Sequence, residues 1–315
     1  MASLNELKSR VASVKSTKQI TRAMYLISAA KSKKAKAQLE SSKPFFDQIF
    51  ITLSEILCAA SASMIDSPFI ESASMRGAAE AGGASSAGAG AGNAATVAAP
   101  AGGPPSLYLV LAGDKGMAGG YNHNIIGFLD ERVEKESAEL LVAGFVGRGR
   151  IKQKGYNVDP GFTYPVMNPS LARARDVADI LIERFLSKRC RDVSIIYTTL
   201  ESALKQTPAM LRLLPLSPGQ FSIGEGRMER IHAIRYVPSS RELFDHLTPH
   251  YVKGLVYDAF VDAFTSEQQA RMVAMDGATK SANELIDALS SRYNRARQAL
   301  ITQEINEIVS GIPEG

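Results

Sequence analysis

The glycine-rich turn at residues 113–120 comes closest to a chemical site in this sequence. It follows the apolar run at residues 107–112, which is typical of a buried strand, and reads Gly-Asp-Lys-Gly-Met-Ala-Gly-Gly. Backbone amides in such a turn can hold a phosphate at the start of a helix. The spacing does not match a Walker A loop, which needs Gly-Lys followed by Ser or Thr, because Gly119 is followed by Gly120 and Tyr121. It does not match the dinucleotide-binding fingerprint either, because no GxGxxG is present. We favour a tight turn with close helix-to-strand packing and keep nucleotide binding as an alternative.

Residue types that support catalysis elsewhere lack productive spacing. The histidines share no ligand spacing on one helix face: His123, His232, His246 and His250. No GxSxG turn or convincing carboxylate pair is present. Cys58 and Cys190 lack CxxC spacing and are interpreted as ordinary reduced residues. The sequence therefore predicts a noncatalytic protein without a metal or a cofactor.

A long helix is predicted at the N-terminal end, over residues 1–62. Ser3 and Glu6 form a capping box, which places the helix start near residue 4. An apolar stripe follows at spacings of three and four and, after a slip, resumes further on: Leu4, Leu7, Val11 and Val14, then Ile20, Met24 and Ile27. Such a stripe predicts a partner helix.

A second long helix is predicted over residues 241–315. Thr248 can cap it and Pro249 can occupy the first helical position. Its stripe runs to a stop at Gly311 and Pro313 and consists of Leu289, Tyr293, Ala296, Leu300, Ile301, Ile305 and Ile308. The two stripes can pair as a coiled coil, and the pairing is antiparallel if the middle of the chain returns to its starting side.

The middle of the chain predicts a flexible insertion followed by an α/β domain. Residues 63–105 are rich in Ala, Gly and Ser and cannot bury enough apolar surface to order themselves. Over residues 106–240, strands at 107–112, 140–146 and 193–198 alternate with helices at 122–136 and 171–188, and residues 231–237 add an edge strand. This alternation indicates a Rossmann-like domain with a mostly parallel sheet.

Composition and charge narrow the classes of protein. With 45% hydrophobic and 22% charged residues, and no apolar run of about 18 residues, we expect a soluble or membrane-peripheral chain. Charges at Glu6, Lys8 and Arg10 argue against a leader peptide.

The first 43 residues are strongly basic, although the whole chain carries a net charge of only +4. They contain only two acidic residues, Glu6 and Glu40, against ten basic ones: Lys8, Arg10, Lys15, Lys18, Arg22, Lys31, Lys33, Lys34, Lys36 and Lys43. This surface is either a solvated helix face or a contact for something acidic. A nucleic-acid-binding coiled-coil scaffold is the alternative, although Tyr25 is the only aromatic residue before Phe45.

Four segments resemble the gamma subunit of the F-type ATP synthase, the central shaft of a rotary motor. They lie at residues 13–24, at residues 114–122, and over residues 266–275 and 293–311. The resemblance implies an antiparallel coiled coil inside a ring of α and β subunits, and an α/β domain beside the ε subunit and the c-subunit ring. It implies no cofactor and no nucleic acid.

The resemblance also implies contact residues. Met24 corresponds to the position where the family shaft meets an acidic β-subunit segment, and Arg297 and Gln298 to a pair that hydrogen-bonds a β-subunit loop. The complete set of expected partner contacts is Lys18, Arg22, Met24, Lys31, Lys33, Tyr236, Arg271, Arg297, Gln298 and Thr302.

Two departures from the family pattern are visible. The insertion before Leu107 is long, and Val237 stands where an acidic residue is common. No regulatory cysteine insertion is evident, which favours a bacterial enzyme. We therefore expect the cytoplasmic face of a bacterial inner membrane, with the matrix face of the mitochondrial inner membrane as the alternative.

Overall fold

The computed structural model describes residues 4–59, 67–70, 104–200, 205–217, 221, 237 and 239–310. The chain divides into two compact units. Unit 1 comprises residues 1–30 and 270–315, and unit 2 comprises residues 31–269. The four segment boundaries expected from the sequence remain a prediction, and residues 71–103 of the expected insertion lie outside the described part.

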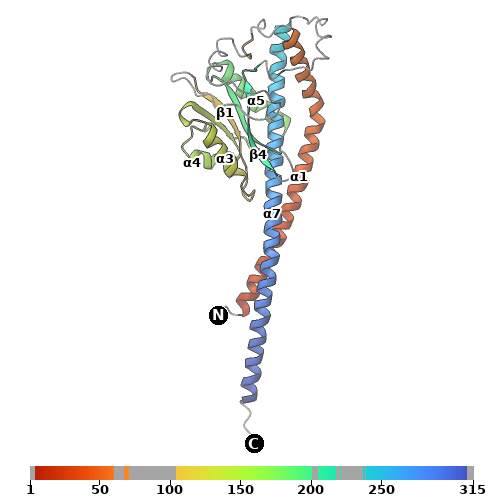
Figure 1. Ribbon diagram of the computed structural model, residues 1–315, viewed down its shortest axis with the longest axis vertical. Coiled ribbons are helices and arrows are strands. Elements are labelled where there is room, and N and C mark those ends of the chain that lie inside the picture. The colour runs from red at the N-terminus through yellow and green to blue at the C-terminus, as the bar shows by residue number, and fades with distance from the viewer. Residues whose placement is uncertain are drawn as a thin grey trace, which may run out of the picture. The chain divides into compact units, whose positions relative to one another are not determined.

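Two long helices, α1 (Leu4–Ala59) and α7 (Ser240–Ser310), confirm the expected helical ends (Figure 1). The expected start of α7 at Thr248 was wrong. The Ser239 hydroxyl accepts a hydrogen bond from the Glu242 amide at 3.2 Å, and Pro249 lies inside the helix. Thr248 bonds the Phe244 carbonyl at 2.8 Å within α7 and therefore does not cap it. A serine cap nine residues before Thr248 thus determines where the helix begins.

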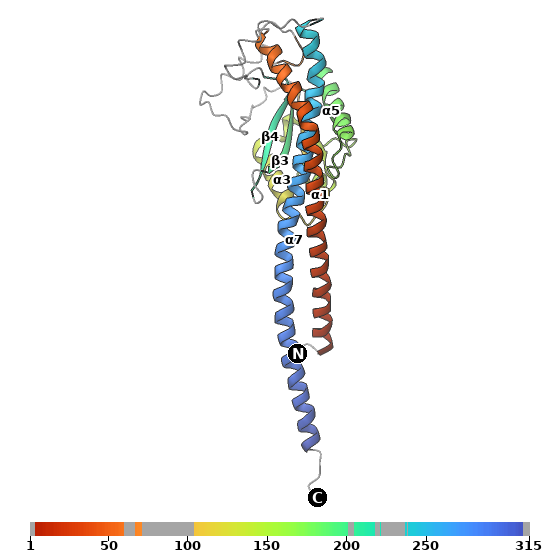
Figure 2. The same ribbon diagram turned by 90° about the vertical axis from the view of Figure 1, so that its right-hand side faces the viewer.

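In unit 1, α1 and α7 lie side by side, as Figure 2 shows, with their seam at seven-residue spacing. On α1, Leu7, Thr21 and Ser28 are buried and Val14 is half-buried. The expected slip was wrong, because Ile20 and Ile27 are 58% and 53% exposed. The seam continues through small and hydroxyl side chains instead, and Thr21 meets Thr279 of α7 with their oxygens 2.8 Å apart.

On α7, the same spacing relates four residues of unit 1. Met275 and Ala282 are buried, and Leu289 and Ala296 are half-buried. A seven-residue repeat is the pattern of a coiled coil, so the expected coiled coil is confirmed. In unit 2 the two helices run antiparallel, because the Phe46 ring lies near Tyr257 while Phe50, further along α1, lies near Tyr251, earlier on α7.

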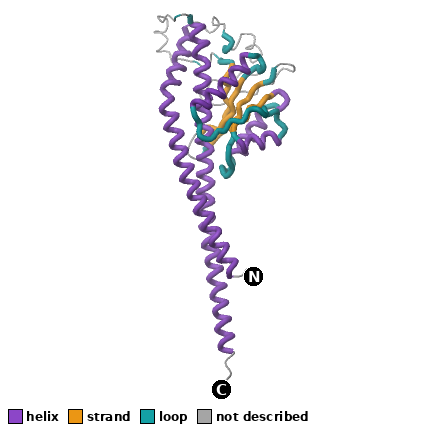
Figure 3. The backbone as a smooth tube through the Cα atoms, turned by 180° about the vertical axis from the view of Figure 1, so that it is seen from behind, coloured by secondary structure: helices purple, strands orange, loops and turns teal. Residues whose placement is uncertain are grey.

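Unit 2 contains a sheet, drawn in orange in Figure 3. It has four strands in the order β2-β1-β3-β4. The strands are β1 (Ser106–Leu111), β2 (Ala138–Ala143), β3 (Val193–Leu200) and β4 (Gln206–Leu214). Strand β1 pairs in parallel with β2 and β3, whereas β4 pairs antiparallel to β3. The mostly parallel sheet is confirmed. Strand β4 was not predicted, and residues 231–236 of the expected edge strand lie outside the described residues.

Alternating side chains of the strands face two sets of helices. Leu107, Leu109 and Ile195 pack in a core with α1, α7 and α5 (Leu171–Leu186). Val110 and Leu140 pack on the other face, with α3 (Tyr121–Arg132) and α4 (Phe145–Gln153). A short 3₁₀ helix, η1 (Lys135–Ser137), precedes β2 and replaces the end of the helix expected to reach residue 136. Helix α4 was not predicted, because the expected second strand extended over its first residues.

Candidate functional site

The glycine-rich turn at residues 113–120 is held by contacts within unit 2. The Gly113 amide donates to Asn122 Oδ1 at 2.7 Å, and a side chain at Gly113 would meet that amide group at 2.9 Å. The Asp114 carboxylate accepts hydrogen bonds from the Phe145 and Met167 amides. These contacts match the expected tight turn, since the Asp114 carboxylate is bonded to the first residue of α4 and to the loop that contains Met167.

Helix α7 covers the sheet edge where doubly wound folds usually bind ligands, the carboxyl ends of the strands on either side of a switch in strand order. Here that point lies between β1 and β3. The Ser266 hydroxyl of α7 donates to the Thr198 carbonyl of β3 at 3.0 Å. The Tyr121 hydroxyl of α3 donates to the Ala263 carbonyl of α7 at 3.2 Å. A helix of the chain itself therefore lies against this point.

Sequence reasoning missed Tyr121 and Ser266, although both lie in the family-like segments. Both are buried, at 3% and 0% exposure. The available signal was a run of polar residues, 265–268, within a helix whose preceding residues are largely apolar. Such a run inside a core requires hydrogen-bond partners.

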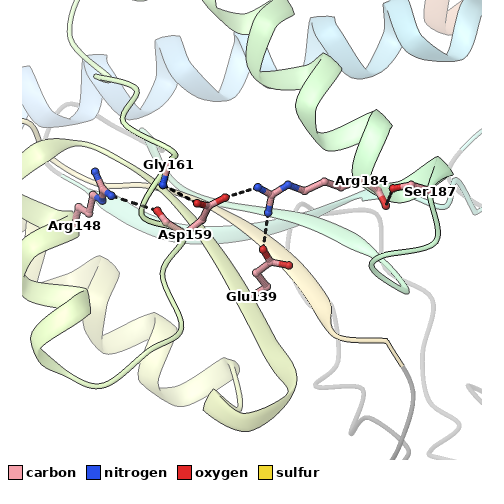
Figure 4. Close-up of polar contacts among 6 residues, drawn as sticks. All are labelled: Glu139, Arg148, Asp159, Gly161, Arg184 and Ser187. Atoms are coloured by element: carbon pink, nitrogen blue, oxygen red, sulfur yellow. Dashed lines mark hydrogen bonds and ion pairs between the residues drawn. The ribbon is translucent and has the colours of Figure 1, made fainter.

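A cavity of about 350 Å³ opens between α5 and the segment after α4. Figure 4 shows the Arg184 guanidinium reaching both Glu139 and Asp159, while the Gly161 amide donates to Asp159 at 2.7 Å. The Arg184 hydrogen bond holds the pKa of Asp159 below its ordinary value. The guanidinium is thereby shared between two carboxylates, which makes this cluster a clamp between α5, β2 and the loop after α4.

Two acidic residues one turn apart on α7, Asp258 and Asp262, carry charges that oppose each other. Burial, together with the neighbouring Asp258, raises the pKa of Asp262 from 3.8 to about 6, against the opposing effect of Lys36 and Lys43 on α1. Because the pKa is raised in the folded state, the ionised side chain destabilises the fold above about pH 6. This cost falls as the pH decreases through 6 toward the unfolded-state pKa.

Asp262→Asn is therefore expected to raise the free energy of unfolding at pH 7.5 by roughly 1–2 kcal/mol, a figure reduced for the partial exposure of the side chain. The gain should vanish near pH 4. Urea denaturation of variant and wild type at both pH values measures it, with Asp287→Asn at an exposed position of α7 as the matched control. An equal gain at both pH values would contradict this origin.

The expected contact residues of unit 1 are distributed unevenly. Lys18 and Met24 are half-buried on α1, and the Arg22 guanidinium lies 5.4 Å from the Tyr25 ring centroid. Arg297, Gln298 and Thr302 are exposed on α7, where the Thr302 hydroxyl donates to the Gln298 carbonyl at 2.9 Å. Arg271 is only 5% exposed. The structure thus brings Arg297, Gln298 and Thr302 onto one exposed stretch of helix.

The other expected contact residues lie outside unit 1. Lys31 is half-buried and Lys33 is exposed, both on the part of α1 that belongs to unit 2. Tyr236 lies outside the described residues. In the described part of the chain, no group of three or more His, Cys, Asp or Glu residues could hold a metal ion. No described helix has a stretch long and apolar enough to cross a membrane.

Large apolar side chains are exposed on the outer faces of unit 1. On α1 these are Ile20, Leu26 and Ile27, and on α7 they are Val273, Leu285, Leu300, Ile301 and Ile305. Beyond the N-terminal end of α1, α7 continues with no other described helix beside it (Figure 2), and its residues 297–306 are all exposed. A contiguous helical surface of this kind is typical of a segment that a partner surrounds.

The family model described as ATP synthase matches residues 3–313. The ATP synthase gamma chain of Ruminiclostridium cellulolyticum is 40% identical over 312 residues, which cover 98% of this chain and 97% of the relative. The chain belongs to the ATP synthase gamma chain family. The gamma chain of Acetivibrio thermocellus is also 40% identical, over 99% of this chain and 98% of the relative.

Solved structures share the fold of the gamma chain family. A chain of the Euglena gracilis mitochondrial ATP synthase, in a structure of OSCP, F1 and c-ring, aligns with a TM-score of 0.62 at 16% identity, covering 98% of this chain and 92% of that chain. As a gamma chain, the protein is a noncatalytic central-stalk subunit of the F-type ATP synthase and associates peripherally with the membrane-bound complex.

Proposed function

We propose that unit 1 is the part of this gamma chain that turns inside a ring of α and β subunits, and that unit 2 faces the ε subunit and the c-subunit ring. The exposed apolar surface of unit 1 carries this proposal. Leu300, Ile301 and Ile305 are between 44% and 53% exposed, on a stretch of α7 beside which no other described helix lies (Figure 2). Complete burial of a fully exposed side chain of this kind is worth roughly 1.5–3 kcal/mol, and about half of that remains available at each position, so a surrounding ring would stabilise the assembly.

Rotation couples to catalysis because the surface of unit 1 is uneven. Three identical β subunits around it meet different faces, so each rotor angle stabilises a different set of open and closed sites. Shifting one site from 1:99 to 99:1 requires about 5.5 kcal/mol of state-dependent interaction. An exposed ion pair supplies only about 0–1 kcal/mol. The torque is therefore shared along the helices, and we expect no single lysine of α1 to be indispensable.

We assign the residue-level contacts of this arrangement from the family resemblance. Met24, with Lys18, Arg22, Lys31 and Lys33 on α1, faces an acidic β-subunit segment. Arg297, Gln298 and Thr302 bind a β-subunit loop. Arg271 is only 5% exposed, which supports a role in positioning α7. Its effect on the partner is then indirect, through the helix.

Co-expression with α and β subunits of the same source tests the proposal. We expect the tagged chain to co-purify with both, and Mg-ATP hydrolysis to depend on its presence. If α and β assemble normally while the chain remains alone, the proposal fails. Salt-sensitive binding to DNA in that case would favour the nucleic-acid scaffold, because phosphate contacts weaken steeply with salt.

Arg297→Ala is expected to weaken the assembly. It removes a charge-assisted hydrogen bond to the β-subunit loop, worth about 1.5–3 kcal/mol, which corresponds to a loss of more than tenfold in affinity. Dissociation of the chain from the α/β ring on dilution measures it. Arg295→Ala, at another exposed arginine two residues away, is the matched control, and equal dissociation of both variants would contradict the assignment.

We further propose that the complex lies with this chain on the cytoplasmic face of a bacterial inner membrane. The two relatives at 40% identity are bacterial gamma chains, which supports this side over the mitochondrial matrix.

A further inference from the structure

The polar contacts between α7 and the α/β domain of unit 2 are unusual for their position. Residues 265–268 of α7 are buried, with Ser266 at 0% and Glu267 at 2% exposure. Residues 259–264, which precede them, are mostly apolar and pack in the core that α7 shares with β1 and β3. The Thr265 hydroxyl is buried with no hydrogen-bond partner. An apolar layer would avoid this desolvation cost, so stability alone does not account for the polar residues.

Two hydrogen bonds cross this layer from different elements of the domain. The Ser266 hydroxyl reaches the Thr198 carbonyl of β3 at 3.0 Å, and the Tyr121 hydroxyl of α3 reaches the Ala263 carbonyl at 3.2 Å. Burial raises the pKa of Tyr121, and the nearby Glu267 raises it further, so the phenol stays protonated and donates. The two bonds meet α7 at positions 263 and 266, less than one turn apart.

Bonds of this kind add a directional constraint to the apolar packing around them. Apolar attraction is non-directional, whereas buried hydrogen bonds are directional and lose much of their energy when misaligned. Because one bond joins α7 to β3 and the other joins α7 to α3, rotation of α7 about its axis would break both bonds together.

We propose that Tyr121 and Ser266 form a torsional lock, which fixes the angle of α7 against the α/β domain so that torque passes between them. The inference rests on the rotor function proposed above. Both residues are positioning residues, since they touch no substrate. The lock joins the shaft helix to the domain at the sheet end where other doubly wound folds place a ligand.

Torsional stiffness of the assembled rotor tests the lock. A bead is attached at Lys152→Cys, an exposed position on α4, in a background without Cys58 and Cys190, and the complex is stalled with a nonhydrolysable ATP analogue. In the Tyr121→Phe, Ser266→Ala double variant we expect at least a twofold larger variance of the bead angle in the stalled complex. ATP hydrolysis, measured without the analogue, should be unchanged. Wild-type variance in the double variant overturns the lock.

Ser54→Ala is the matched control. Ser54 is 1% exposed, and its hydroxyl bonds the Phe50 carbonyl within α1 at 2.7 Å, so its loss removes a buried hydroxyl without freeing the domain. An equal increase in variance with Ser54→Ala also overturns the proposal. If the double variant does not assemble, Tyr121→Phe alone is measured by the same criterion.

The lock and the rotor function fail in different ways. If the wild-type bead does not rotate under ATP, the rotor proposal has failed. Hydrogen exchange in the chain then tests the lock independently. Amides of α3 and of α7 residues 263–268 should exchange at least threefold faster in the double variant, and unchanged exchange there overturns the lock.

Discussion

Gly144→Ala should unfold or severely loosen the α/β domain. Gly144 joins β2 to α4 with φ at +100°, a conformation that L side chains rarely adopt, and an added Cβ would lie 2.1 Å from the Ala112 carbonyl oxygen. The backbone strain costs about 1–3 kcal/mol and the forced repacking a similar amount. Together they remove roughly 2–6 kcal/mol from a total that is typically about 5–15 kcal/mol.

Urea denaturation combined with hydrogen exchange in β1 and β2 measures this effect. Gly149→Ala on α4 is the matched control, because a Cβ there meets nothing within 4 Å. An alanine inside a helix without steric conflict should be neutral or should stabilise by up to about 1 kcal/mol. If both substitutions gave the same small change, the close approach of the β2–α4 junction to Ala112 would not hold the domain together.

Met24→Lys should uncouple proton pumping from ATP hydrolysis. Met24 is half-buried on a basic helix, and the added cation would strengthen attraction to an acidic β-subunit segment at some rotor angles only. An extra 1.4 kcal/mol at one angle is about a tenfold bias in the population of rotor states. Rotation then stalls or slips at that angle, while hydrolysis in the β subunits continues.

Proton pumping into membrane vesicles, divided by ATP hydrolysis in the same preparation, measures the coupling. We expect the ratio to fall to less than half of the wild-type value. Met24→Leu keeps the size of the side chain and adds no charge, so it should keep the wild-type ratio. An unchanged ratio in Met24→Lys would show that this position does not face the acidic segment.

The sequence predicted the long helices and the parallel core of the sheet because their signals are local. Apolar periodicity and strand-helix alternation determine them over short windows. Strand β4 was missed because Pro208 and polar residues dilute its pattern, and the strand is stabilised by its pairing with β3. The seam of α1 was misread at Thr21 and Ser28, which are buried although they are hydroxyl residues.

The contact residues could be predicted only through family resemblance. An exposed Arg297 has the same local sequence signals whether it binds a partner or solvent, since its contacts are made by another chain. Ser266 and Tyr121 make their contacts within the chain, but with residues far away in the sequence. Their bonds join residues 68 and 142 positions apart, and no local pattern reports such pairs.

Direct observation of rotation tests the central claim. The α/β ring is fixed to a surface, a bead is attached to α4 at Lys152→Cys, and Mg-ATP is added. The account predicts unidirectional rotation of the bead, with pauses at three evenly spaced angles set by the three β subunits. A bead that only fluctuates about one angle while the complex hydrolyses ATP would contradict the claim that this chain is the rotor.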